Sequence, residues 1–146
     1  MKTCKCVPSI AMLFTIVLIS SSLVYAEEDK NADVKKSWDS ARVYVPGNRS
    51  KTTPDKVKVE KPLPVVIYLH GCSGLTSEND SWGDYIKELG YIAVLPDSLA
   101  RRSEINCDPR TKKGGTFPKA HAMRQEEIRY AFDQIKSSPW ADAKND

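Results

Sequence analysis

The sequence predicts an α/β fold, and three observations carry this prediction. Pro64–Leu69 and Tyr91–Leu95 are short continuous runs of large and β-branched apolar residues, which is typical of strands buried on both faces. Between them, apolar residues recur at helical spacing from Trp82 to Leu89, and Gly90 follows as a helix stop. A strand, a helix and a strand within about thirty residues form a βαβ unit. Such a unit predicts a parallel pair of strands joined by a right-handed crossover.

Two further elements flank this unit. Ala41–Val45 alternates polar and apolar residues and predicts a short strand, ended by Pro46 and Gly47. Lys119–Ser137 predicts a helix, because its apolar residues recur at helical spacing. The order strand, strand, helix, strand, helix predicts a three-layer sandwich with a mostly parallel sheet. Three strands and two helices make an incomplete version of that architecture, because parallel sheets need both faces covered.

The N-terminal segment 1–26 has the pattern of a secretory signal peptide. Lys2 and Lys5 give a positive start, an apolar stretch is densest from Ile10 to Ile19, and Val24-Tyr25-Ala26 fits the cleavage site. The apolar stretch is too short for a comfortable membrane span. We therefore expect a secreted or periplasmic protein with no stable span after cleavage. A retained N-terminal anchor is the alternative.

The remaining residues form one small domain at most. Residues 27–40 are polar and charged and predict a flexible leader, and residues 41–146 predict the folded domain. The net charge of the whole chain is +3, and two lysines leave with the signal peptide. The mature chain is thus near neutral, which gives no support to nucleic-acid binding. Its histidines and cysteines show no zinc-ligand spacing, so we expect no metal and no cofactor.

Two cysteines remain after cleavage of the signal peptide, Cys72 and Cys107. In an exported protein such a pair is a candidate disulfide. Two separate thiols are the alternative, because spacing alone does not define connectivity.

A cluster of small residues follows the strongest predicted strand, in the sequence His70-Gly71-Cys72-Ser73-Gly74. Residues of this kind let the backbone come close to a ligand. Asp97 directly follows the next strand, and α/β sheets bind ligands at the carboxyl ends of their strands. The alternatives are a tight turn between strand and helix for the glycines, and a turn cap for Asp97.

The run from Val65 to Gly74 resembles the third strand and the oxyanion loop of α/β-hydrolases. Trp82–Leu89 and Gly90–Ser98 look like the helix and strand that follow, and the order of segments is most similar to the dienelactone hydrolase branch. Arg124–Asp142 resembles the helix and turn that precede the nucleophile strand of that family. The resemblance covers roughly Val43–Asp146, so residues 41–146 would be the N-terminal part of such a domain.

The resemblance implies hydrolysis of a small carboxylic ester or lactone through an acyl-enzyme. Charge develops on the carbonyl oxygen during acyl transfer, and backbone N–H groups held in place stabilise it. At the matching position of this chain the donor is the N–H of Cys72, with His70 and Gly71 forming the rest of the oxyanion loop. The substrate would lie beside Ser73, Gly74 and Asp97.

The family's nucleophile lies in a Gly-x-Ser-x-Gly elbow or its cysteine form, and neither spacing occurs in this sequence. Gly71-Cys72-Ser73-Gly74 differs because its second glycine comes one residue early and it follows the wrong strand. The acid and the histidine follow the nucleophile in chain order. We therefore expect this chain alone to be inactive. A non-catalytic partner subunit, oligomeric through an exposed sheet edge, and a truncated gene product are the alternatives.

Overall fold

A computed structural model describes residues 31–71, 73–101 and 118–142. The chain divides into two compact units, Met1–Ala32 and Asp33–Asp146. Of the first unit only residues 31 and 32 are described, and both are helical. The predicted signal peptide, residues 1–26, lies outside the described residues. All elements named below belong to the second unit.

The second unit contains a three-stranded sheet. Its strands are β1 (Arg42–Tyr44), β2 (Val65–Ile67) and β3 (Ile92–Leu95), in the order β1-β3-β2. β2 pairs with β3 in parallel and β1 pairs with β3 antiparallel. The predicted α/β class is confirmed, but the sheet is mixed, not mostly parallel. The antiparallel β1 lies at an edge, where mixed α/β sheets often carry such a strand.

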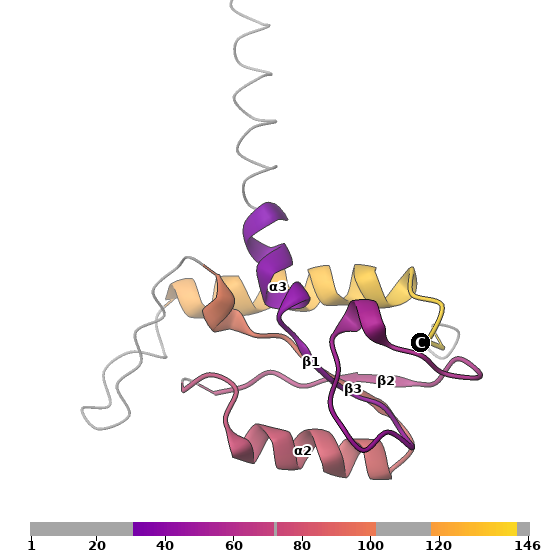
Figure 1. The fold of residues 1–146 in the computed structure, drawn as a ribbon. Helices are drawn as coiled ribbons and strands as arrows, with labels where there is room; N and C mark the ends of the chain where they lie inside the picture. The colour runs from indigo at the N-terminus through magenta and orange to yellow at the C-terminus, as the bar shows by residue number, and fades with distance from the viewer. Residues whose placement is uncertain (1–30, 72, 102–117, 143–146) are drawn as a thin grey trace, which may run out of the picture. The chain divides into compact units, whose positions relative to one another are not determined.

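Helices cover both faces of the sheet. α2 (Ser77–Glu88) and α3 (Pro118–Lys136) lie on opposite faces, as Figure 1 shows. Two short 3₁₀ turns, η1 (Pro54–Lys56) and η2 (Ser98–Ala100), lie in loops. A further helix over residues 33–39 precedes β1. Among the described residues, no helix combines the length and the apolar character that crossing a membrane requires.

α2 begins and ends at local signals in the sequence. The backbone N–H of Thr76, its N-cap residue, donates to Asn79 Oδ1 at 2.8 Å. At the other end, Gly90 has a φ of +89°, which favours glycine, and its N–H bonds to the carbonyl oxygen of Lys87 at 3.0 Å.

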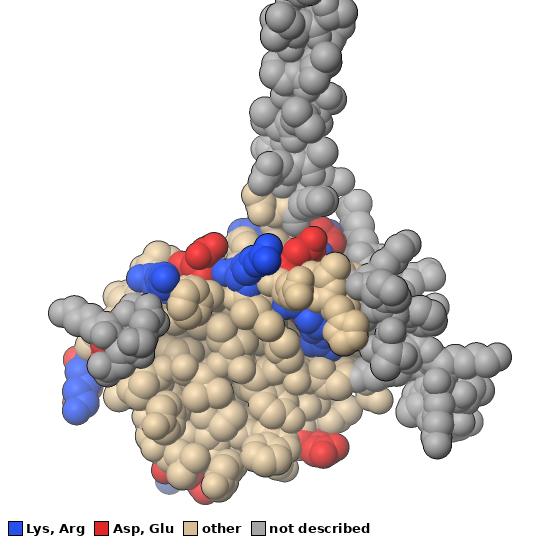
Figure 2. Space-filling model, turned by 180° about the vertical axis from the view of Figure 1, so that it is seen from behind, with Lys and Arg blue, Asp and Glu red and all other residues tan. Residues whose placement is uncertain are grey.

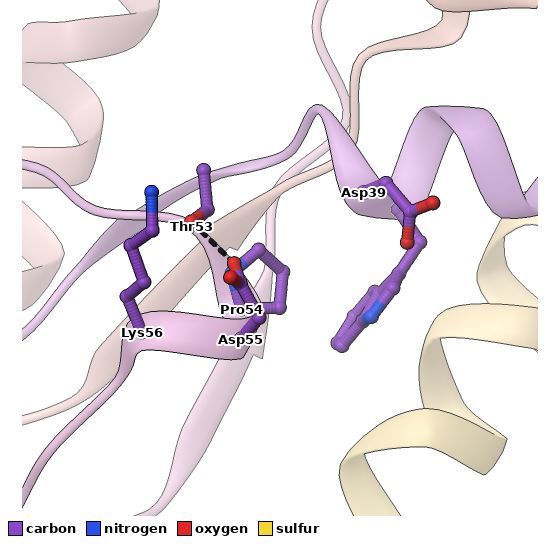
Figure 3. Close-up of a pocket in the computed structure, with 6 residues that line it drawn as sticks. Asp39, Thr53, Pro54, Asp55 and Lys56 are labelled. Carbon is purple, nitrogen blue, oxygen red and sulfur yellow. Dashed lines mark hydrogen bonds between the residues drawn. The ribbon is translucent and has the colours of Figure 1, made fainter.

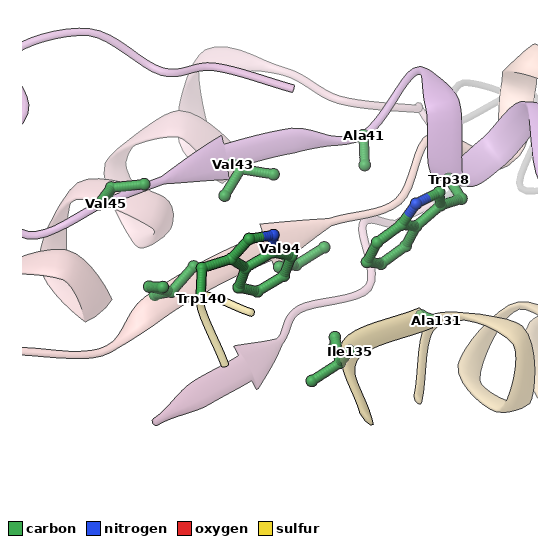
Figure 4. Packing of buried hydrophobic residues seen from close by; sticks show 9 residues of the cluster. Trp38, Ala41, Val43, Val45, Val94, Ala131, Ile135 and Trp140 are labelled. Atoms are coloured by element: carbon green, nitrogen blue, oxygen red, sulfur yellow. The ribbon is translucent and has the colours of Figure 1, made fainter. Parts of the chain in front are cut away.

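The core is divided between the two faces, because successive strand residues point to opposite sides. Residues 92 and 94 of β3 point toward α3, and residues 93 and 95 point toward α2. The larger cluster, shown in Figure 4, contains Trp38, Ala41, Val43, Val45, Ile92, Val94, Ala131, Ile135 and Trp140. The smaller cluster contains Tyr44, Ile86, Ala93 and Leu95.

The predicted flexible leader, residues 27–40, is wrong for residues 33–40. This segment is helical up to residue 39, and Val34 and Trp38 are 5% and 7% exposed. The two side chains are four residues apart, so they lie on one face of the helix and pack into the domain. A single pair of apolar residues in a charged segment is too weak a pattern to predict a helix.

One more backbone pairing lies on the outer edge of β2. Leu63 forms a parallel bridge with Ala141. The N–H of Leu63 donates to the carbonyl oxygen of Trp140 at 3.0 Å, and its own carbonyl accepts from the N–H of Asp142 at 2.9 Å. Residues 140–142 therefore pair in parallel with the segment just before β2.

Candidate functional site

Two loops meet at the carboxyl ends of β2 and β3, as the sequence predicts. The loop after β2 spans residues 68–74 and the loop after β3 spans residues 96–101. Gly74 has a φ of +77°, and a Cβ atom there would lie 2.6 Å from Cδ1 of Leu99. Glycine is thus required at position 74 both for its backbone conformation and for the close contact of the two loops.

Not every predicted site residue can be placed. Cys72 and Cys107 lie outside the described residues, so the predicted N–H donor and the candidate disulfide remain predictions. Gly71 and Ser73 are exposed on the surface of the loop. A Cβ atom at Gly71 would meet nothing within 4 Å, so there is open space beside its backbone.

His70 is buried, at 4% exposure, and both of its ring nitrogens are engaged. Nε2 accepts a hydrogen bond from the backbone N–H of Ser98 at 3.0 Å. The ring proton is therefore on Nδ1, which donates to the carbonyl oxygen of Gly71 at 2.6 Å. Burial lowers the pKa of His70, so the neutral ring is favoured. His70 joins the two loops and is not free to act as a base.

Arg124 on α3 holds the same loop from the other side. Its Nη2 donates to the carbonyl oxygen of His70 at 2.7 Å. Burial lowers the pKa of this guanidinium, which still carries its charge at neutral pH. The backbone of the loop after β2 is thus fixed by a charged group from a neighbouring helix.

Glu127, also on α3, connects this arrangement to the loop after β3. Its side chain is fully buried, and its Oε2 accepts from the hydroxyl of Ser98 at 2.7 Å. Nη1 of Arg101 lies 3.5 Å from its Oε1. Arg101 also bonds to Asp33 at 3.0 Å and Glu126 at 2.8 Å. Burial alone would lower the pKa of Arg101, but these hydrogen bonds raise it.

This polar network of Ser98, Arg101, Arg124 and Glu127 was not predicted from the sequence. The position of Glu127 in the sequence is the one signal that could have indicated this network. Glu127 is four residues before Ala131 and eight before Ile135, so it lies on the buried stripe of α3. A carboxylate at a core position needs buried partners, which predicts nearby cations or hydroxyl groups.

The side chain of Asp97 bonds to the backbone of its own loop. Its Oδ1 accepts from the backbone N–H of Leu99 at 3.0 Å and caps η2. Its own N–H donates to the carbonyl oxygen of Ser37 at 2.9 Å. The side chain therefore acts as the turn cap that the sequence offered as an alternative to a ligand contact.

A separate cavity of about 420 Å³ lies between the helix over residues 33–39 and η1, as Figure 3 shows. Two carboxylates, from Asp39 and Asp55, line it together with Trp38. Asp39 is paired with Lys35 at 2.5 Å, and Asp55 accepts from the hydroxyl of Thr53. Across the described residues, no three His, Cys, Asp or Glu side chains are grouped to hold a metal ion.

No family model matches this chain, and no curated protein matches it in sequence. The resemblance to dienelactone hydrolases therefore depends on the segments quoted above. The geometry adds a loop after β2 that is held from both sides. Within the described part of the chain, His70 is engaged at both nitrogens and His121 is exposed on α3. This arrangement can fix backbone donors in place, but it offers no activated nucleophile.

Proposed function

We propose that this chain is the N-terminal portion of an exported, dienelactone hydrolase-like α/β-hydrolase that acts on carboxylic esters or lactones. The observation that carries the proposal is the fixed loop after β2. Arg124 donates to the carbonyl of His70, Ser98 donates to its ring, and the ring donates to the carbonyl of Gly71, so the backbone of residues 70 and 71 is held before any substrate arrives. Such preorganisation is what stabilises an oxyanion without rearrangement.

The sheet gives a second line of support. Residues 140–142 pair in parallel with Leu63, which lies just before β2. A strand continuing in this direction would run beside β2 and end near the candidate oxyanion loop. In a three-layer hydrolase sandwich, that is the position from which a strand delivers the nucleophile elbow. The N-terminal pattern of residues 1–26 supports export.

In this proposal the chain supplies one part of the chemistry. The N–H of Cys72 would donate to the oxyanion of the tetrahedral intermediate, and neutral His70 would hold the loop. The nucleophile, the acid and the base would come from residues beyond Asp142, because no Gly-x-Ser-x-Gly or Gly-x-Cys-x-Gly spacing occurs in the sequence.

An activity assay on the purified mature chain tests this division. We expect no labelling by a serine-directed fluorophosphonate and no hydrolysis of a nitrophenyl ester. Ser73→Ala and Cys72→Ala variants serve as matched controls. Clear turnover that either substitution abolishes would contradict the proposal, because the nucleophile would then lie in this loop.

The open edge of β2 favours a second candidate function, a non-catalytic partner subunit. The carbonyl oxygen of Pro64 and the N–H of Tyr68 bond to β3. Backbone groups alternate in direction along a strand, so the N–H and carbonyl groups of Val65 and Ile67 point away from β3, to the outside of the sheet. Within the described residues, the backbones of Val65 and Ile67 have no partner on that side. β2 is the strand farthest from the viewer in Figure 1, and Figure 2 shows this face with a broad area free of charged side chains. An uncovered strand edge of this kind is suited to pairing with another chain.

Light scattering of the mature chain tests the second candidate. A folded homodimer or a stable heteromer would support it, because an uncovered strand edge is suited to pairing with another chain. A well-folded monomer at high concentration would contradict it.

A further inference from the structure

Two large aromatic side chains on α2 are exposed to solvent. Trp82 is 46% exposed and Tyr85 is 53% exposed. Their ring centroids lie 5.9 Å apart at an interplanar angle of 84°, so the rings form a corner. Tyr68, directly after β2, stacks on Trp82 at 6.1 Å and 21° and holds that ring in place. Exposed aromatic clusters of this kind commonly mark binding sites.

The corner is one wall of a shallow pocket. Its volume is about 420 Å³, and it is lined by Glu78, Ser81, Trp82 and Tyr85. Glu78 precedes Trp82 by four residues and Ser81 precedes Tyr85 by four residues, so each polar side chain lies one helical turn from a ring. The pocket thus combines two perpendicular aromatic rings with one carboxylate.

The charge of that carboxylate is not compensated within the described chain. The neighbouring acids of α2 are paired, since Asp80 lies 2.6 Å from Arg42 and 2.9 Å from Lys51. Asp84 lies 2.7 Å from Lys87. Among the described residues, none forms a hydrogen bond or an ion pair with Glu78. The pocket therefore has a negative rim and aromatic walls.

We infer that this pocket binds an organic cation of the quaternary or methylated ammonium class. Aromatic faces attract cations through their quadrupole, and the weakly hydrated methyl groups of such ions fit against rings. The carboxylate of Glu78 adds charge complementarity. The inference goes beyond the proposed hydrolase function, because the pocket contains no residue of the loops after β2 and β3.

Titration with tetramethylammonium and choline at constant ionic strength tests this inference. The readout is the indole N–H resonance of Trp82 in a nitrogen-15 spectrum, because Trp38 and Trp140 are buried. We expect a saturable shift with a dissociation constant on the order of millimolar. The neutral isostere 3,3-dimethylbutan-1-ol should bind roughly ten-fold more weakly, because it lacks the charge.

Matched variants separate the pocket from the rest of the surface. Trp82→Leu keeps an apolar side chain at that position and should abolish the shift that choline causes in the ring resonances of Tyr85. Glu78→Gln should weaken choline binding about three-fold. Glu88→Gln and Tyr91→Ala alter an acid and an aromatic residue outside the pocket and should leave binding unchanged. Equal binding of choline and its neutral isostere would overturn the inference. A Trp82 resonance that instead shifts with protein concentration would also overturn it, because the aromatic face would then pair with a second copy.

Discussion

Nη2 of Arg124 donates a 2.7 Å hydrogen bond to the carbonyl oxygen of His70, and so ties α3 directly to the loop after β2. The ring of His70 accepts from Ser98 in the loop after β3. One residue therefore joins a helix and two loops at the edge where the sheet presents its candidate site.

Replacing Arg124 should destabilise the domain. Arg124→Met leaves the carbonyl oxygen of His70 without its charged donor, which should cost about 1–3 kcal/mol of unfolding free energy. Urea denaturation followed by circular dichroism measures this. Arg129→Met changes an exposed arginine on the same helix and should stay within about 0.5 kcal/mol of the original. Equal stability of the two variants would show that the contact with His70 is unimportant.

Glu127 should matter more than its neighbour Glu126. Glu127→Leu leaves the hydroxyl of Ser98 without its acceptor. It also leaves Arg101 and Arg124 without the carboxylate that lies 3.5 and 3.8 Å from their guanidinium groups, so a loss of about 3–5 kcal/mol is expected. Glu126→Leu removes an ion pair to Arg101 whose carboxylate is 43% exposed, so about 1 kcal/mol or less is expected. Chemical denaturation of both variants measures the difference. Similar losses would contradict the assignment of Glu127 as the buried centre of the network.

His70 should make the domain less stable in mild acid. Burial lowers its pKa from the ordinary 6.5 and outweighs the hydrogen bond to the carbonyl of Gly71, which raises the pKa; the charge of Arg124 also lowers it, and Asp97 and Glu127 raise it slightly. The unfolded chain then takes up a proton that the folded chain does not, so the stabilisation present above pH 6.5 is lost as pH falls below it. Thermal unfolding at pH 7.5 and 5.5 measures the loss. The loss should disappear in His70→Asn and persist in His121→Asn; its persistence in the first variant would contradict this account.

Asp80 should contribute stability that is lost only in strong acid. Burial alone would raise its pKa, but hydrogen bonds from Tyr44, Lys51 and Arg42 lower it from 3.8 to about 2. Its contribution is therefore complete well above pH 4 and is lost as pH falls through about 2. Asp80→Asn should cost about 1–2 kcal/mol at pH 7, a value reduced because the carboxylate is 30% exposed. The cost should vanish near pH 2 in denaturation experiments.

Asp84→Asn is the matched control for that prediction, because it removes an exposed pair with Lys87 on the same helix. It should change stability by about 0.5 kcal/mol or less. If both substitutions have equal effects at pH 7, the contacts of Asp80 with β1 do not stabilise the domain.

The elements between Ala41 and Ser137 could be predicted from the sequence because their signals are local. Apolar runs at Val65 and Ile92, helical spacing from Trp82 and the stop at Gly90 all lie within single segments. The direction of β1 could not be predicted in this way, because pairing across a sheet depends on residues about fifty positions apart. The helix over residues 33–39 was missed because only Val34 and Trp38 mark its buried face.

Some features of the candidate site could also be predicted from the sequence, and others could not. The position of the loops after β2 and β3 follows from the parallel strands, and the alternative role of Asp97 as a cap agrees with its contact to Leu99. The place of Glu127 on the buried stripe of α3 marks a buried acid, but its partners Ser98 and Arg101 could not be assigned from the sequence, because they lie about 26–29 residues away in another loop. Hydrolase membership and the disulfide of Cys72 and Cys107 stay predictions.

We propose that the loop after β2 belongs to a hydrolase whose nucleophile lies beyond Asp142. The sequence of the transcript past the codon for Asp146, together with the intact mass of the native protein, tests this proposal. We predict a reading frame that continues into an apolar strand and a Gly-x-Ser-x-Gly or Gly-x-Cys-x-Gly elbow. A stop codon directly after Asp146, with a stable native protein of the corresponding mass, would contradict the claim.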